Sequence, residues 1–390
     1  MGYEFTGTDL DFLRSEAGAG ALAEVDALEF GARTSVRDTA SVRSRFPDHA
    51  SAVIETVTVR RKARVKLFGA DHWLVTDDAV QQATPTLVAR RRATRLAGRR
   101  VHDVTCSIGS ELAVLVESAE LAVGSDLDPI RLRMAAHNVP GATVLRADAL
   151  TPTTRETVVV ADPGRRAGGR RRHDPAALQP PLPDLLDAYR GRDLVVKCAP
   201  GLDFDALDWA GEIEVVSLDG GVREACLWSR GLGENAVRRR AAVLRSDGSA
   251  LEITDAEPDE IPVRPPGEYI VDPDGAVVRA GLVRHYGAKF GLWQLDPRIA
   301  YLTGDTVPVG VRGFRILEHS KFSEKALRQQ LTRLGCGSVE ILVRGVDVDP
   351  ALLRPRLKLR GTVSLSVVIA RIERSAVAFV CEPGAVRQPV

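Results

Sequence analysis

The chain has 390 residues, which is enough for two or three domains and at least one large hydrophobic core. Its 53 Lys and Arg residues nearly balance 52 Asp and Glu residues, so any nucleic-acid partner would have to bind a local basic patch. Five scattered cysteines without a CxxC pair argue against a disulfide framework or a zinc site. An acidic N-terminus and the lack of a long apolar run predict neither a signal peptide nor a membrane span, so we expect a cytoplasmic protein.

Residues 1–80 are expected to form a mainly helical N-terminal region. Apolar side chains recur there at roughly helical spacing: Leu10, Leu13, Leu22, Val25, Leu28 and Phe30. Pro85 opens a further predicted helix, TLVARRRATRLAG, which Gly98 ends. The three consecutive arginines of this helix, Arg90, Arg91 and Arg92, point in different directions, so we interpret them as a solvated face.

Residues 81–250 are predicted to form an α/β core. Short apolar runs alternate with helix-like segments between positions 100 and 230, which favours a parallel sheet covered by helices. The strand candidates are RVHDV, ELAVG, ATVL, TVVVAD, DLVVKC and IEVVSLD, and the helix candidates are ELAVLVESA and PIRLRMAAHN. EACLWSRG suits a late strand antiparallel to IEVVSLD, and RRAAVLRSDGSALEIT is typical of a hairpin.

A Pro-rich linker, AEPDEIPVRPPGE, separates this core from a second region. Residues 265–390 combine a predicted helix, SEKALRQQLTRL, with the predicted strands SVEILVRG, TVSLSVVIARI and SAVAFVCE. We therefore expect a small α+β domain at the C-terminal end.

The segment VHDVTCSIGSE is the first candidate site. A buried strand is expected to end at Asp103 and to enter a turn of small residues before a helix that begins near Ser110. Small side chains let a ligand approach the backbone, and the helix N-terminus offers unpaired N–H groups. Gly109 remains from the usual three glycines of such turns, while Thr105 and Ser107 occupy two of their places.

Acidic residues follow the next predicted strands. Asp126 ends a strand about twenty residues after the turn, where a carboxylate would accept hydrogen bonds from ribose hydroxyls, and Asp128 could instead cap the following helix. Asp148 follows a strand where a carboxylate can accept from an adenine amino group, although a solvated loop residue is the alternative. Because the ends of parallel strands share one sheet edge, these side chains and Asp162 are expected to converge on one ligand.

The segment VVVADPGRRAGGRRRHDP is the candidate catalytic loop. Pro163 fixes φ and lacks an N–H, so the carbonyl beside it can point into the site. Such a loop can accept hydrogen bonds from an exocyclic amine and hold the nitrogen lone pair toward a methyl donor. Five arginines follow and are suited to phosphate: Arg165, Arg166, Arg170, Arg171 and Arg172. Lys197 at another strand end is either a phosphate or substrate contact or a snorkelling surface residue.

Two residue types give no sign of a catalytic thiolate or a metal site. Cys106 lies in the candidate turn, but no neighbouring His indicates a thiolate, so we interpret it as a packing residue. The seven histidines form no HxxxH or HExxH pair, so no metal is expected.

These segments in this order resemble class I S-adenosylmethionine-dependent methyltransferases. They look like a bacterial group with a C-terminal THUMP-like domain, and the core is similar to trimethylguanosine synthase-like enzymes, which methylate the exocyclic N2 of guanine. The segments that carry the resemblance are KLFGADHWLVTDDAVQQAT, HDVTCSIGSE, SDLDPIRLRMAAHN, ADPGRR, VVKCAPGLD, VEILVRGVDVDP and LKLRGTVSLSVVIAR. The resemblance implies a Rossmann-like doubly wound sheet, S-adenosylmethionine as cofactor and, because THUMP domains are associated with RNA, an RNA substrate such as tRNA or rRNA.

The resemblance also implies residue roles. The implied cofactor contacts are Asp103, Thr105, Cys106, Ser107, Gly109, Asp126, Leu127, Asp148 and Ala149. The implied catalytic residues are Asp162 and Pro163, and the implied substrate contacts are Arg165, Arg166, Lys197 and Trp73.

The catalytic loop departs from the family pattern (Asp/Asn)-Pro-Pro-aromatic, because Gly164 and Arg165 replace its last two residues. In amine methylases the aromatic stacks on the base, so either the target is not a nucleobase or another aromatic is needed. Trp73 is one candidate, and Gln82 and Thr84 beside it are expected to face the cofactor. An RNA base methyltransferase, a methyltransferase of small molecules or proteins, and an RNA-binding protein without transfer activity therefore all remain open.

Overall fold

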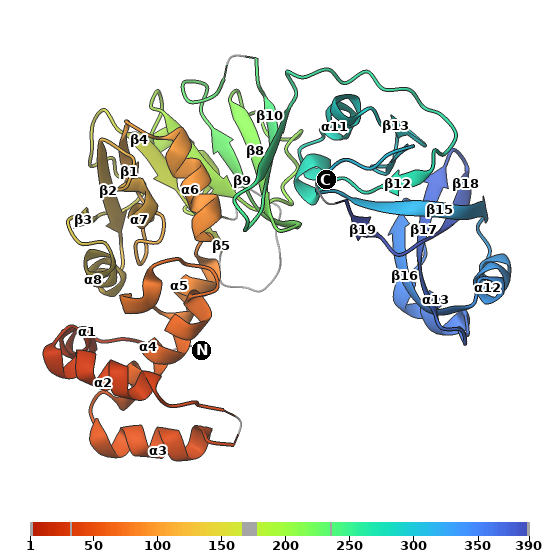
Figure 1. Cartoon of the computed structure of the whole chain (residues 1–390). Helices are drawn as coiled ribbons and strands as arrows, with labels where there is room; N and C mark the ends of the chain where they lie inside the picture. The colour runs from red at the N-terminus through yellow and green to blue at the C-terminus, as the bar shows by residue number, and fades with distance from the viewer. Residues whose placement is uncertain (1–2, 32, 166–177, 235, 388–390) are drawn as a thin grey trace. The chain divides into compact units, whose positions relative to one another are not determined.

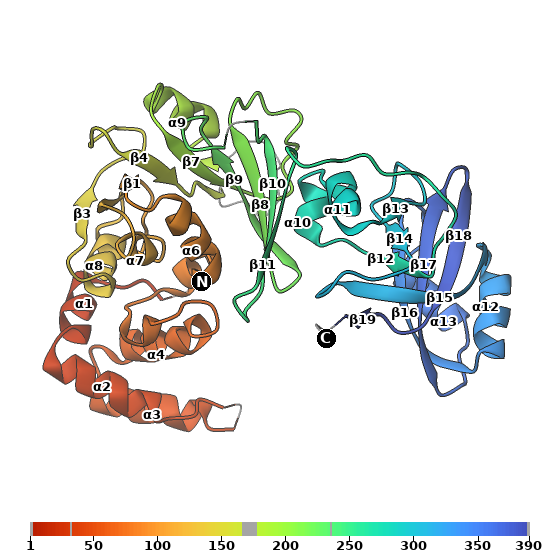
Figure 2. The same cartoon turned by 45° about the horizontal axis from the view of Figure 1, so that its top comes forward.

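The computed structural model describes residues 3–387 apart from 32, 166–177 and 235 (Figures 1 and 2). The chain divides into two compact units. The first comprises residues 1–219, 223–234 and 244–249, and the second comprises 220–222, 235–243 and 250–390.

The first unit begins with helices, as the apolar spacing predicts. They are α1 (Gly7–Leu13), α2 (Glu16–Asp26), α3 (Ser35–Arg45), α4 (Ala50–Ala63), the 3₁₀ turn η1 (Ala70–His72) and α5 (Asp77–Gln82). Thr6 forms a capping box with Asp9 at the start of α1, and Ser15 and Thr76 cap α2 and α5. The apolar faces meet in one core, with α4 in contact with α2, α3 and α5.

A parallel sheet follows the helices, with the order β3-β2-β1-β4-β7-β9-β8 in this unit. Its strands are β1 (Arg100–Asp103), β2 (Leu121–Asp126), β3 (Thr143–Arg146), β4 (Val158–Ala161), β7 (Leu194–Cys198), β8 (Glu212–Leu218) and β9 (Gly221–Trp228). The first five are joined by parallel pairs, and β9 runs antiparallel to β7. β4 and β7 are fully buried, as expected of strands covered on both faces.

Helices pack on this sheet and connect its strands. They are α6 (Thr86–Arg95), α7 (Leu112–Leu115), α8 (Pro129–Asn138) and α9 (Leu182–Ala188). α8 contacts β2 and β3, α7 contacts β2, and α6 contacts β8. The predicted helix over ELAVLVESA is correct in place but short, because turns take up its second half. The short strands β5 (Gly164–Arg165) and β6 (Leu178–Gln179) pair antiparallel beside the sheet edge.

The predicted hairpin consists of β10 (Arg239–Leu244) and β11 (Ala250–Thr254), which are neighbouring strands. Its turn has Gly248 at φ +87°, a conformation that glycine adopts without a steric penalty.

The second unit contains a sheet in the order β13-β14-β12-β15-β18-β17-β16, with β19 paired to β15. Its elements are β12 (Tyr269–Val271), α10 (Gly275–Arg279), α11 (Val283–Phe290), β13 (Trp293–Gln294), β14 (Leu302–Gly304), β15 (Arg312–Lys321), α12 (Glu324–Arg333), β16 (Cys336–Arg344), α13 (Pro350–Arg356), β17 (Val363–Ile372), β18 (Ser375–Cys381) and β19 (Ala385–Val386). The predicted helix and three predicted strands correspond to α12, β16, β17 and β18, whereas the remaining elements from β12 to β19, including β15 and α13, were not predicted.

Successive side chains of β17 point to opposite faces of the sheet, so they belong to two different hydrophobic clusters in the second unit. Val367 packs with Leu327 of α12 and Leu353 of α13, whereas its neighbour Val368 packs with Phe314 of β15. This period of two is what a strand covered on both faces requires. Over the residues that the structure describes, no helix has the length and apolar character to cross a membrane.

Candidate functional site

A cavity of about 770 Å³ opens at the edge where β1, β2, β3, β4 and β7 end. Residues at or just after the ends of the five strands line it, together with residues of α5 and of the segment 179–181. They include Asp103, Thr105, Cys106, Ser107, Asp126, Leu127, Asp148, Ala149, Asp162 and Lys197. The parallel register explains this convergence, since Asp103 stands opposite Gly124 of β2 and Val160 of β4.

The turn after β1 forms hydrogen bonds to neighbouring strand ends at the two positions that depart from the glycine pattern, Thr105 and Ser107. The Thr105 hydroxyl accepts a hydrogen bond from the Asp162 backbone N–H at 2.7 Å, and its own N–H donates to Asp103 Oδ1 at 3.1 Å. Ser107 has φ +48°, a left-handed value that favours glycine, and its N–H donates to Asp126 Oδ2 at 3.0 Å. The Thr105 hydroxyl and the Ser107 backbone N–H therefore tie the turn to two neighbouring strand ends.

Cys106 and Gly109 support the turn from behind. Cys106 is buried against β2. It packs so closely that a Cβ atom added to Gly124 would lie 3.0 Å from the Cys106 Sγ atom. Burial, followed by the charges of Asp103 and Asp126, raises the pKa of the Cys106 thiol far above its ordinary value, so this side chain stays a neutral packing group. Gly109 has φ +87° and lies close to Ala135 and Val139 of α8.

Asp126 and Asp128 take different positions. The sequence left open a cavity role and a helix-capping role, and each of the two residues takes one of them. Asp128 caps α8 and accepts from the N–H groups of Ile130 and Arg131. Asp126 lines the cavity and accepts from Ser107 and Asp128 N–H groups, one on each carboxylate oxygen. Leu127 between them is 58% exposed and gives the cavity an apolar face.

Asp148 and Ala149 line the cavity from the loop after β3. Asp148 Oδ1 accepts from the Leu150 N–H at 2.9 Å, so the loop holds the carboxylate in place. Asp148 is thus a fixed residue of the cavity wall.

Asp162 and Lys197 form an ion pair in the cavity. The Lys197 side chain is only 8% exposed, and its ammonium group donates to Asp162 Oδ2, whereas the Asp162 side chain is 44% exposed. Burial lowers the pKa of Lys197, but the charges of Asp162 and Glu224 outweigh this effect and keep its pKa above the ordinary value. Lys197 is therefore a buried cation that fixes Asp162 and not a snorkelling surface residue.

A second set of charges lies behind the cavity and centres on Arg92. This side chain of α6 is 2% exposed, so the interpretation of all three arginines as a solvated face is wrong for Arg92. Its Nε and Nη2 donate to the two carboxylate oxygens of Glu111 at 2.8 and 2.6 Å, and its Nη1 donates to Glu224 of β9. Glu111 also lines the cavity, so Arg92 connects the cavity wall to the interior.

Thr84 belongs to this buried network, which corrects its expected role. Its hydroxyl donates to Glu224 at 3.1 Å, and among the residues that line the cavity, Gln82 and Ala83 are present but Thr84 is not. Burial opposes ionisation of Glu224, but the Arg92 and Lys197 charges prevail and hold its pKa below the ordinary value.

Asp103 is the most perturbed carboxyl group of the cavity. Burial is the main cause that raises its pKa from 3.8 to about 7, and the negative charge of Glu111 adds to it. Asp103 is 2% exposed, and within the described part of the chain its partner is Thr105 of the same turn. The group therefore titrates near neutral pH.

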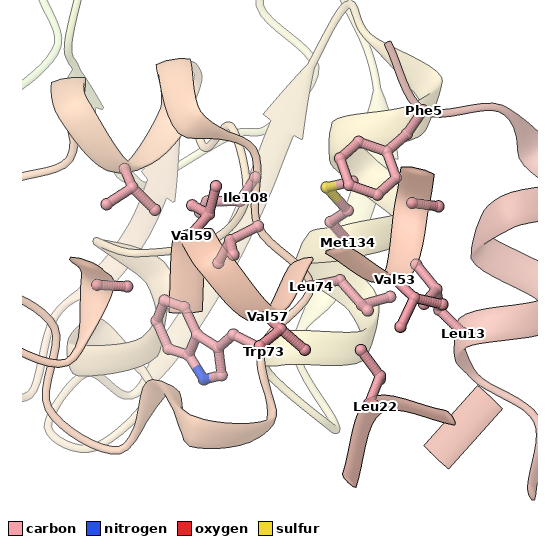
Figure 3. Close-up of a cluster of buried hydrophobic side chains, with 14 of the residues drawn as sticks. Phe5, Leu13, Leu22, Val53, Val57, Val59, Trp73, Leu74, Ile108 and Met134 are labelled. Carbon is pink, nitrogen blue, oxygen red and sulfur yellow. The ribbon is translucent and has the colours of Figure 1, made fainter. Parts of the chain in front are cut away.

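Three predicted substrate residues are not placed in the cavity. Trp73 is 9% exposed in the core of the N-terminal helices, and Figure 3 shows its indole among side chains that include Val57 and Leu74. Its expected role as a base-stacking aromatic is therefore incompatible with its packing. Arg166 lies outside the described residues, as do Arg170, Arg171 and Arg172, and Arg165 is described only as backbone in β5. Pro163 is buried between Asp162 and Gly164.

Sequence reasoning missed several residues of the cavity wall. Glu111 follows the small-residue turn directly, and an acidic residue at that point was the available signal. Ala79 and Ala83 come from α5 and its C-terminal cap, and Gln179, Pro180 and Pro181 come from the end of β6 and the residues after it. No sequence motif indicated these positions. In the described residues, no group of three His, Cys, Asp or Glu side chains could hold a metal ion.

Two family models match parts of the chain. The THUMP domain-like model matches residues 311–383, which run from β15 to the end of β18. A model for a domain of unknown function, DUF8688, matches residues 7–63, which comprise α1 to α4.

Relatives match most of the chain. An uncharacterized S-adenosylmethionine-dependent methyltransferase of Mycobacterium tuberculosis, strain H37Rv, is 57% identical over 359 residues, which are 88% of this chain and 99% of that protein. The protein of the same description from strain CDC 1551 matches equally. A crystal structure of a Porphyromonas gingivalis W83 protein assigned as a methyltransferase has the same fold, with a TM-score of 0.71 at 20% identity, over 86% of this chain and 91% of that one. The chain belongs to the S-adenosylmethionine-dependent methyltransferases and carries a THUMP-like domain at its C-terminal end.

Proposed function

We propose that the protein methylates an exocyclic or ring nitrogen of a base in RNA, such as tRNA or rRNA. The observation that carries the proposal is Asp162, a half-exposed carboxylate at the cavity edge that Lys197 and Thr105 hold in one orientation. A fixed hydrogen-bond acceptor at this point suits an amine that must present its lone pair to a methyl donor.

The cavity fits S-adenosylmethionine, which supplies an electrophilic methyl group when it is bound. Asp126 would accept hydrogen bonds from ribose hydroxyls, and Asp148 would accept one from the adenine amino group beside the apolar side chain of Leu127. Asp103 is nearly fully buried, lines the cavity and has no cationic partner at hydrogen-bond distance among the described residues, so it suits a positively charged group of the cofactor. The small side chains of Thr105, Ser107 and Ala149 would leave room for the cofactor.

Asp162 would act on the acceptor by accepting a hydrogen bond from its N–H group. Lys197 occupies Oδ2, and among the described residues no donor contacts Oδ1, which is then available to the acceptor. Pro163 lacks an N–H, so its own backbone cannot donate a competing hydrogen bond at this position. Positioning and desolvation would then supply most of the rate enhancement.

Basic residues support an RNA acceptor. The segment from α13 to β17 in the THUMP-like domain presents four exposed cations on alternate positions, Arg354, Arg356, Lys358 and Arg360. Arg354 donates to the Val339 carbonyl and Arg356 pairs with Glu324, whereas Lys358 and Arg360 make no ion pair within the described residues. Cations without ion-pair partners can contact phosphates. We propose the same role for Arg165 and Arg166, which follow Asp162 closely in the sequence.

The direct test of transfer uses labelled S-adenosylmethionine and total RNA from a strain that lacks the gene. We expect label in one nucleoside, a loss of at least about a hundredfold in rate for Asp162→Ala, and cofactor affinity within about threefold of wild type, because positioning acts on the acceptor. Lys197→Met should also lower the rate with little effect on cofactor affinity. Asp187→Ala, at an exposed aspartate paired with Arg190, serves as the control. Unchanged incorporation by Asp162→Ala would remove this residue from the mechanism.

The test of RNA binding uses salt. Affinity for the same RNA should fall steeply with salt, and Lys358→Ala with Arg360→Ala should reduce the slope by about two counterions. Arg284→Ala is a matched control, because this exposed arginine already pairs with Asp259. Affinity that is absent or insensitive to salt would instead favour a small-molecule or protein acceptor.

A further inference from the structure

Negative charge prevails in the wall of the cavity. Among the described residues that line it, the carboxylates are Asp103, Glu111, Asp126, Asp148 and Asp162, and the cations are Arg131 and Lys197. Arg131 lies 3.6 Å from Asp128, and Lys197 is bound to Asp162, so both cations have acidic partners. A ligand that carries positive charge would balance the remaining carboxylates.

Glu111 holds part of this charge in a fixed place. Its two oxygens receive Nε and Nη2 of Arg92, so the carboxylate cannot turn away from the cavity without breaking two hydrogen bonds. Arg92 does not cancel Glu111 alone, because the same guanidinium also binds Glu224. Two buried carboxylates share one buried cation, and the network keeps a net negative charge.

Asp103 adds a charge that varies with pH. The groups that act on it are Glu111 from the turn, Asp162 after β4 and Lys197 of β7, with the Thr105 N–H as its direct partner. No cation contacts its second oxygen within the described residues, although the residue is 2% exposed. A buried carboxylate without a cation ionises more readily when a cationic ligand is bound beside it.

We propose that Glu111 and Asp103 make the cavity selective for the cationic methyl donor over its neutral demethylated product. The inference rests on the cofactor site of the proposed function, but it needs no RNA. When the methyl group moves to the acceptor nitrogen, the electron pair of the broken S–C bond stays on sulfur and the acceptor nitrogen later loses a proton. The sulfonium thereby becomes a neutral thioether, and the attraction to the acidic wall falls in the same step. The product is then released more easily than the donor.

The test is calorimetry with the full-length protein, S-adenosylmethionine and S-adenosylhomocysteine at low salt, at pH 5.5 and pH 7.5. At pH 7.5 we expect the donor to bind at least about tenfold more tightly than the product, and this ratio to fall about fivefold at pH 5.5, where Asp103 is protonated. Sinefungin, which carries an amine in place of the methylated sulfur, should behave like the donor.

Variants identify the residue responsible. Glu111→Gln should weaken donor binding about tenfold and change product binding by less than about twofold. Asp187→Asn is the control, because this exposed aspartate is not part of the cavity wall or of the Arg92 network, so its donor-to-product ratio should stay close to wild type. If the buried Glu111→Gln variant fails to fold, the wild-type pH series decides the question.

Three outcomes separate the proposals. A donor-to-product ratio near one that does not change with pH overturns this inference and leaves the cofactor site intact. Equal weakening of donor and product by Glu111→Gln likewise assigns Glu111 a structural role only. If neither compound binds, the cofactor site of the proposed function is wrong and the inference fails with it.

Discussion

Replacing Asp103 by Asn should stabilise the protein at alkaline pH and leave its stability unchanged in acid. Burial and the Glu111 charge raise the pKa of Asp103 from 3.8 to about 7 in the folded chain. The folded state therefore binds this proton more tightly than the unfolded state. The stability that the folded state gains from this proton is fully present below pH 3.8 and is lost as the pH rises through about 7.

The size of the effect follows from the two pKa values. Each pKa unit corresponds to about 1.4 kcal/mol, so an ionised Asp103 lowers the free energy of unfolding by about 4 kcal/mol above pH 7. At pH 5 the folded state still keeps the proton, and the cost is smaller by about 3 kcal/mol. Asn removes the charge while its carbonyl can still accept the 3.1 Å hydrogen bond from the Thr105 N–H.

Urea denaturation of both proteins at pH 5 and pH 8 measures this effect. The advantage of Asp103→Asn in the free energy of unfolding should grow by about 3 kcal/mol between the two pH values. Asp187→Asn, at an exposed position, should show no such growth and controls for general effects of charge. An advantage of the same size at both pH values would refute the reasoning, because it would mean that Asp103 does not titrate in this range.

Two further predictions concern the same unit. Arg92→Leu should lower the free energy of unfolding by about 3–5 kcal/mol in urea denaturation, because Glu111 and Glu224 lose their shared cation. Arg90→Ala, at a half-exposed side chain, should change the free energy of unfolding by less than about 0.5 kcal/mol. Equal effects of the two changes would contradict the buried network. Ser107→Gly should raise the thermal midpoint by relieving about 1 kcal/mol of left-handed strain at φ +48°, and a lowered midpoint would show that the serine side chain outweighs the strain.

Much of the α/β core could be predicted because its signals are local. Each predicted strand of the core overlaps a strand of the structure, since buried parallel strands form short apolar runs between helices. The strand β15 escaped prediction because RGFRILEHSK mixes charged and apolar residues along its length, and its exposure alternates accordingly. The helix α13 escaped because Pro355 interrupts its short apolar pattern.

The candidate site was predictable where it depends on strand ends and not where it depends on packing between distant segments. Asp103, Asp126, Asp148 and Asp162 share the cavity because parallel register brings their strands to one edge. Nothing local in the sequence of Arg92 distinguishes it from Arg90 and Arg91, because its partners lie 19 and 132 positions away. The predicted role of Trp73 was wrong for the same reason, since its neighbours come from a core that forms only when the helices pack.

The departure from the glycine-rich pattern at Thr105 argues against a core that has lost its function. A turn that no longer held a ligand would be free to accumulate side chains without partners, whereas the Thr105 hydroxyl accepts a hydrogen bond from the backbone of Asp162, which lines the cavity. Thr105 fixes the backbone of Asp162, which Lys197 fixes from the other side, so the turn and the segment after β4 form one rigid wall. Because this wall keeps a buried cation, a half-exposed carboxylate and an almost fully buried Asp103 in place at a cost in stability, the arrangement is best explained by selection for binding and transfer.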